Sequence, residues 1–173
     1  ANEAAVSLGQ VANVKRLLED REWIKGSEAG FQLSDPGSLL AEWAENTNTK
    51  KTAAENYYTL KSPSEFETAL AQACEQAGIP YALTGFSGAA RYAPAVRYQR
   101  AMAYVGRDLE KIAEQLSLKR VESGANVTLY DPPDEGVLYG SRPIDGICIA
   151  APVQVYLDLV GLKGRGEEAA NDL

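Results

Sequence analysis

The sequence of 173 residues contains no histidine, two cysteines and a single methionine. The absence of histidine excludes a Ser-His-Asp triad, and two cysteines without histidine are too few for a structural zinc site. Cys74 and Cys148 lie in apolar surroundings, so we expect both to be free buried thiols. No apolar run approaches the roughly 20 residues of a membrane span, and no segment resembles a signal peptide. We therefore expect a cytoplasmic protein, and we expect it to carry neither a metal nor a cofactor.

Positive charge is also scarce. The chain has 17 lysine and arginine residues against 24 acidic ones, which gives a formal net charge of −7. A polyanion such as DNA would therefore have to be bound by a local patch rather than by bulk charge. The hydrophobic content of 45% is sufficient for a core, and the length allows one large domain or a medium domain with a small appendage.

The clearest predicted helix runs from Ser7 to Ile24. Ser7 and Gln10, three residues later, form a capping-box signature. An apolar stripe follows at helical spacing and consists of Leu8, Val11, Val14 and Leu18. The opposite side carries small and polar residues, namely Gly9, Ala12, Asn13 and Arg16, with Gln10 on its flank. Such a face suits a helix that contacts DNA bases; a solvated polar face is the alternative.

Two short strand-like runs, 22–25 and 30–33, flank the predicted hairpin loop 26–29. A polar-faced helix followed by a hairpin is the second half of a winged helix, whose wing lies beside the phosphate backbone. We therefore expect residues 1–46 to be the C-terminal part of a winged-helix domain, without its first two helices. The residues that we expect to bind DNA are Ser7, Gln10, Asn13, Arg16, Lys25 and Ser27.

Residues 55–173 alternate between strand and helix patterns and are expected to form an α/β domain with a mixed sheet. The predicted helices are 62–77, a short helix starting at Ala89, 107–118 and 152–160, with a final one after Gly166. The predicted strands are 57–60, 81–83, 98–105, around 121, 127–130, 137–139 and 144–151. The whole chain is therefore predicted to be α+β. The element order also looks like that of a nucleotidyltransferase-like fold. We call it degenerate because strand 98–105 lacks the carboxylates that would hold Mg²⁺.

Several stretches resemble one protein family: residues 7–24, 33–44, 81–99 and 151–170. They look like the AbiEi-type antitoxins of type IV toxin–antitoxin systems, which are transcriptional regulators. The resemblance implies a winged helix that binds the promoter of its own operon and a C-terminal domain tied to antitoxin function. It also implies a nucleotidyltransferase-like toxin encoded alongside, which the antitoxin counters without gripping it stably. The expected partners are therefore promoter DNA and, as a functional link, this toxin; a homodimer is left open.

The pattern of segment 81–105 predicts a strand, a turn at residues 84–88 that we call the glycine corner, a short helix and a second strand. The corner lacks the lysine of a phosphate-binding loop and the spacing of a nucleophile elbow, so we expect a structural or ligand-positioning role. Arg91 and Arg97 flank it, and Arg165 lies between two glycines later in the chain. We expect the segments 81–99 and 151–170, which carry these arginines, to meet and form an anion-binding antitoxin surface. The alternative is that these arginines only fasten helices by pairing with Asp158, Glu167 or Glu168.

Two other functions are compatible with the sequence. Asp131, Asp134 and Glu135, with Asp145, could serve a metal-dependent nucleotidyltransferase or nuclease. Pro132 and Pro133 stiffen that loop, however, and EF-hand spacing is lacking, so a solvated turn is preferred and we expect no enzymatic activity. The aromatic residues Tyr92 and Tyr98 could instead form a protein-interaction surface.

Overall fold

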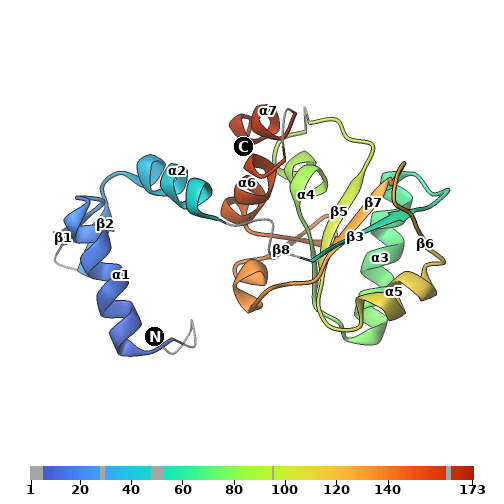
Figure 1. Ribbon diagram of the computed structural model, residues 1–173, viewed down its shortest axis with the longest axis horizontal. Helices are drawn as coiled ribbons and strands as arrows, with labels where there is room; N and C mark the ends of the chain where they lie inside the picture. Colours follow the sequence, from blue (N-terminus) through green and yellow to red (C-terminus); the bar gives the residue numbers. More distant parts are fainter. Residues whose placement is uncertain (1–5, 28–29, 48–52, 95, 163–164) are drawn as a thin grey trace. The chain divides into compact units, whose positions relative to one another are not determined.

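A computed structural model describes residues 6–27, 30–47, 53–94, 96–162 and 165–173 (Figure 1). The chain divides into two compact units, residues 1–47 and residues 48–173. None of the helices in the described ranges has the length and hydrophobicity needed to cross a bilayer.

The first unit contains α1 (Leu8–Asp20), the antiparallel strands β1 (Ile24–Ser27) and β2 (Gly30–Leu33), and α2 (Pro36–Asn46). The predicted capping box is confirmed at the start of α1, and the predicted hairpin is confirmed as the β1–β2 pair. Gly26 and Ser27 belong to β1 rather than to the loop, and Glu28 and Ala29 lie outside the described residues. The α1 stripe is solvent-accessible in this unit, since the helix has no buried residue.

The second unit is built on a mixed sheet, as predicted. Its strands are β3 (Ala54–Tyr58), β4 (Tyr81–Leu83), β5 (Ala101–Val105), β6 (Lys119–Arg120), β7 (Val127–Tyr130), β8 (Arg142–Ile144) and β9 (Ile147–Ile149). Their order in the sheet is β6-β3-β7-β5-β4-β9-β8. The β5–β7 and β4–β9 pairs are parallel and the others antiparallel.

Helices cover both faces of this sheet (Figure 1). One face carries α3 (Pro63–Ala77) and α5 (Leu109–Gln115), and the other carries α4 (Gly85–Tyr92), α6 (Pro152–Val160) and α7 (Arg165–Asn171). Successive strand residues point to opposite faces. Leu83 therefore packs in the α3–α5 core, whereas its neighbour Ala82 packs in the α4–α6–α7 core. The strand β4, which leads into the glycine corner, therefore contributes to both hydrophobic cores.

Three predicted elements have other bounds in the structure: α1 ends at Asp20 rather than at Ile24, β3 starts at Ala54 rather than at Tyr57, and β5 starts at Ala101 rather than at Tyr98. Three more differ further. Residues 137–139, predicted as a strand, lie at a 3-10 helix, η2 (Glu135–Leu138), because the Asp134 carboxylate accepts a hydrogen bond from the Gly136 N–H and starts a turn. Helix α4 starts at Gly85 rather than at Ala89. The predicted strand 144–151 is a hairpin of β8 and β9, which turns at two residues with positive φ, Asp145 and Gly146.

Candidate functional site

The candidate DNA-contacting residues of α1 all lie on exposed positions. The Ser7 N–H donates to Gln10 Oε1 at 2.9 Å, and the Gln10 N–H donates to Ser7 Oγ at 3.2 Å. These two side chains therefore start the helix, and the group of Gln10 left for an external ligand is its amide nitrogen. Asn13 and Arg16 follow along the helix with their side chains exposed to solvent.

The hairpin is attached to α1 by short contacts. The Trp23 N–H donates to the Leu18 carbonyl at 2.9 Å, and the Ser34 hydroxyl donates to the Glu22 carbonyl at 2.6 Å. The Arg21 guanidinium lies 4.9 Å from the centre of the Trp23 ring, a cation–π contact. Helix and hairpin therefore form one body that can meet a surface together.

Lys25 and Ser27 lie on the exposed side of β1, whereas Ile24 is buried. Lys25 is paired with Gln32 across the hairpin, and Ser27 is paired with Gly30 next to the loop. The two candidate residues of the hairpin are therefore presented by a paired strand, and Ser27 lies at its loop end.

Internal ion pairs determine which lysine and arginine side chains of this unit are available to contact an external anion. All four lysine and arginine residues of residues 1–47 lie between Lys15 and Lys25. Lys15 pairs with Glu19 at 3.4 Å, and Arg21 pairs with Glu42. Within the described residues, Arg16 and Lys25 have no carboxylate partner. These are the two basic residues that the sequence assigns to DNA binding.

In the second unit, the two C-terminal blocks meet as the sequence predicts. Arg165 Nη2 donates to the Arg97 carbonyl at 2.6 Å, and its guanidinium lies 6.0 Å from the centre of the Phe86 ring. Gly164, which was expected to ease this approach, is outside the described residues. A cavity of about 220 Å³ opens at the junction and is lined by Phe86, Arg97, Tyr98, Gln99, Arg100, Met102, Leu162 and Arg165. We name it the arginine pocket.

Arg91 does not line the arginine pocket. Its guanidinium forms an ion pair with Glu67 at 3.0 Å and approaches the exposed Asp145 at 3.8 Å. Glu67 lies on α3, is completely buried, and also accepts a hydrogen bond of 2.7 Å from the Tyr98 hydroxyl. Burial, followed by the bond to Glu67, raises the pKa of Tyr98. Arg91 thus links α4 to α3.

A second carboxylate, that of the half-buried Asp158 on α6, lies on the opposite side of the sheet. It accepts hydrogen bonds from Tyr104 at 2.8 Å, from Gln154 at 2.9 Å and from the Thr84 hydroxyl. Burial raises the pKa of Asp158, and the three donors oppose that rise. The network ties the glycine corner to α6 and β5. It leaves Asp158 unavailable to the arginines that the sequence offered as its partners.

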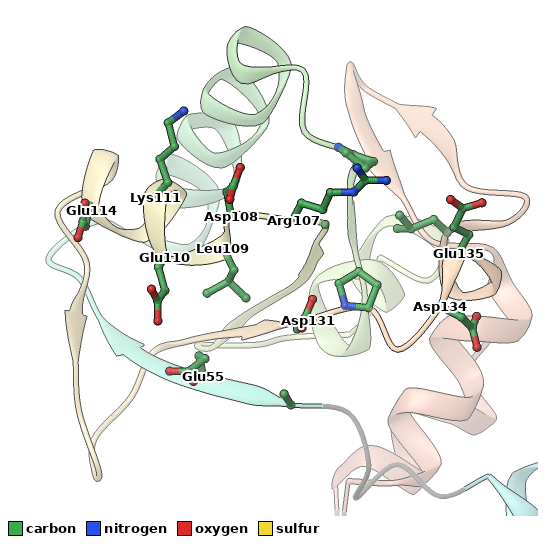
Figure 2. A pocket seen from close by; sticks show the side chains of 15 residues that line it. Glu55, Arg107, Asp108, Leu109, Glu110, Lys111, Glu114, Asp131, Asp134 and Glu135 are labelled. Atoms are coloured by element: carbon green, nitrogen blue, oxygen red, sulfur yellow. The ribbon is translucent and has the colours of Figure 1, made fainter.

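An acidic cleft of about 870 Å³ contains the residues of the enzymatic alternative (Figure 2). Asp131, Asp134 and Glu135 line it together with Glu55, Asp108, Glu110 and Glu114. Figure 2 shows the carboxylates spread around the rim, with Asp134 turned away from Asp131. No group of three or more potential ligands in the described residues is arranged to hold a metal ion. Asp145 is not part of this lining and approaches Arg91 instead.

The protein-interaction alternative rests on Tyr92 and Tyr98, and the hydroxyl groups of both residues are used in internal hydrogen bonds. The Tyr92 hydroxyl donates to the Ala150 carbonyl at 2.7 Å, and Arg142 lies 5.4 Å from its ring centre. Tyr98 is likewise tied to Glu67. Both rings are half-buried and fasten elements of the second unit.

Sequence reasoning missed Arg100 and Glu67. Arg100 precedes β5 and its Nε donates to the Ala125 carbonyl at 3.2 Å, a contact across 25 residues that no local pattern signals. Glu67 occupies an ordinary helical position directly after the buried Phe66. Its burial follows only from partners 24 and 31 residues away.

Comparison with known proteins identifies one family. Searches of curated proteins and of solved structures found no match. A family model described as "Transcriptional regulator, AbiEi antitoxin, Type IV TA system" matches residues 32–173, which include the mixed sheet of the second unit and the arginine pocket. Because the match covers well over half of the chain, the protein belongs to the family of AbiEi antitoxins, the transcriptional regulators of type IV toxin–antitoxin systems.

Proposed function

We propose that the protein is a cytoplasmic repressor that binds the promoter of its own operon through α1 and the β1–β2 hairpin, in the manner of a winged helix. The observation that carries the proposal is the exposed polar face of α1, where Asn13 and Arg16 are exposed and Arg16 has no carboxylate partner in the described chain. The family model begins at residue 32, so these residues precede the matched region and are argued from their own chemistry.

The proposed contacts divide by type. Asn13 and the amide nitrogen of Gln10 suit base edges in the major groove, because an asparagine or glutamine amide pairs with adenine. Arg16 suits guanine or a phosphate, and Lys25 on the hairpin suits the phosphate backbone. Ser7 and Ser27 contribute hydroxyl groups at the start of the helix and next to the loop of the wing. Phosphate contacts would position the protein, and base contacts would select the sequence.

A gel-shift titration on the promoter of the operon tests this assignment. Asn13→Ala should weaken specific binding by about 1–3 kcal/mol, the usual worth of a good base contact. If Arg16 contacts a phosphate, Arg16→Ala should weaken binding to all sequences and reduce the salt dependence by about one ion. Lys15→Ala is the matched control, since Lys15 is the adjacent residue and is already paired with Glu19. Unchanged affinity in both the Asn13 and Arg16 variants would exclude α1 as the reading helix.

The second part of the proposal is that the protein counters a nucleotidyltransferase-like toxin and is not itself an enzyme. Strand β5 carries no carboxylate, and the acidic cleft has no gathered ligand set in the described residues. Incubation with labelled NTPs, Mg²⁺ or Mn²⁺ and RNA acceptors should therefore give no transfer. Incorporation that Asp131→Asn or Asp134→Asn abolishes would restore the enzymatic alternative. Co-expression with the neighbouring toxin gene should relieve growth arrest.

A further inference from the structure

We infer that the arginine pocket binds the phosphate group of a nucleotide, either a free nucleotide or the 5′ end of a nucleic-acid strand. Three arginines, Arg97, Arg100 and Arg165, belong to its lining, and no acidic residue among the described ones does. None of the three forms an ion pair with a carboxylate of the described residues. In a chain with a net charge of −7, this grouping of unneutralised cations favours an anionic ligand.

Two of these arginines are oriented by neutral groups. Arg165 donates to the Arg97 carbonyl at 2.6 Å, and Arg100 donates through Nε to the Ala125 carbonyl at 3.2 Å. A carbonyl fixes a guanidinium without cancelling its charge, and each guanidinium keeps further N–H donors for a ligand. Guanidinium groups match phosphate oxygens with paired hydrogen bonds. Two of the three arginines are therefore held in place before a ligand arrives.

The rest of the lining suits the organic part of a nucleotide. Met102 is buried, and Phe86, Tyr98 and Leu162 are half-buried beside the arginines. Aromatic and apolar surfaces next to a cationic rim accommodate a sugar or a base. At about 220 Å³, the cavity is smaller than the roughly 300–1,000 Å³ of most ligand pockets, so it can take up part of one nucleotide unit but not a helical segment. This size favours a free nucleotide or a strand end over duplex DNA.

Equilibrium dialysis of the full chain against labelled GTP or ATP, and against 5′-phosphorylated and 5′-hydroxyl versions of one short oligonucleotide, tests the inference. Arg97→Gln is the cleanest variant, because the carbonyl that holds Arg165 is kept. Loss of one guanidinium–phosphate contact should weaken binding about 10- to 100-fold. Arg107→Gln is the matched control, since Arg107 lines the acidic cleft of the same unit. It should bind as the wild type does.

The arms separate the two sources of phosphate. Nucleotide binding that Arg97→Gln weakens identifies a free nucleotide, and a preference for the 5′-phosphorylated strand that the same variant abolishes identifies a strand end. Equal binding of both oligonucleotides without nucleotide binding, an Arg107→Gln effect as large as that of Arg97→Gln, or no binding of any probe at millimolar concentration would overturn the inference. Arg165→Lys, which keeps the charge but loses the planar fork, should be weakened as well, and circular dichroism checks its folding.

This inference is independent of the proposed repressor function. Arg97→Gln should leave promoter affinity unchanged, and Asn13→Ala should leave nucleotide binding unchanged. Promoter affinity therefore tests the proposed repressor function, and nucleotide binding separately tests the arginine pocket.

Discussion

Replacing Glu67 by glutamine should destabilise the second unit strongly, although the two side chains have nearly the same shape. Glu67 is fully buried and accepts hydrogen bonds from the Arg91 guanidinium at 3.0 Å and from the Tyr98 hydroxyl at 2.7 Å. It thereby joins α3 to α4 and to the segment between α4 and β5. Glutamine keeps an oxygen acceptor but removes the negative charge, so Arg91, whose side chain is 20% exposed, is left without its main counter-charge. Breaking a buried ion pair from one side costs about 3–5 kcal/mol. That loss is a large fraction of the roughly 5–15 kcal/mol by which domains are usually stable.

Urea unfolding followed by far-UV circular dichroism measures this loss. Both tryptophans, Trp23 and Trp43, lie in residues 1–47, so tryptophan fluorescence reports on the first unit and serves as an internal control. A double replacement of Glu67 and Arg91 by leucine should recover much of the stability, because a buried pair can often be exchanged for apolar residues at little cost. A Glu67→Gln midpoint equal to that of the wild type, or single and double variants with simply additive losses, would refute the reasoning.

Three further predictions concern the same unit. Ser62→Ala removes the cap of α3 and should lower the free energy of unfolding by about 1 kcal/mol in the same urea assay. Gly166→Ala should cost about 1–3 kcal/mol, since the added Cβ would collide with the Leu159 carbonyl oxygen, whereas Gly26→Ala, with open space around it, is the control. The pKa of Asp158 is raised in the folded state. The stabilisation that follows from this shift is therefore fully present below the pKa of the unfolded state, and it is lost as pH rises through the pKa of the folded state. The stability of the wild type relative to Asp158→Asn should therefore increase as pH is lowered from 7 towards 4 in thermal melts; a constant difference would contradict this.

Local signals in the sequence account for the elements that were predicted correctly. Ser7 with Gln10 and Ser62 with Glu65 each form a capping box, and Gly78 ends α3 in the left-handed conformation. These features depend on residues within one helical turn, which is why they can be seen without a fold. The strand at 81–83 was predictable for a related reason, because a short apolar run beside turn formers has few alternatives.

The errors occur where another interaction decides the conformation. Val137 and its neighbours have the composition of a strand, but the Asp134 cap turns them into a 3-10 helix. In the candidate sites, the approach of Arg165 to Arg97 could be anticipated from the glycines on both sides of Arg165 and from the glycine corner that precedes Arg97. The absence of Arg91 from the arginine pocket could not be anticipated. It depends on an ion pair with the buried Glu67, which lies 24 residues earlier in the sequence.

The two candidate sites share one electrostatic feature, which would allow an acidic chain to bind the anions that we propose. In the first unit, ion pairs with Glu19 and Glu42 engage Lys15 and Arg21, whereas Arg16 has no such partner in the described residues.

The second unit follows the same rule. Glu67 engages Arg91 and Glu55 engages Arg120, whereas the three arginines of the arginine pocket have no carboxylate partner among the described residues. Arg100 and Arg165 donate to neutral backbone carbonyls instead. At physiological ionic strength, charges more than about 8 Å apart are largely screened. The net charge of −7 should therefore have little effect at either site, and the proposed binding would depend on which cations have no carboxylate partner within the protein.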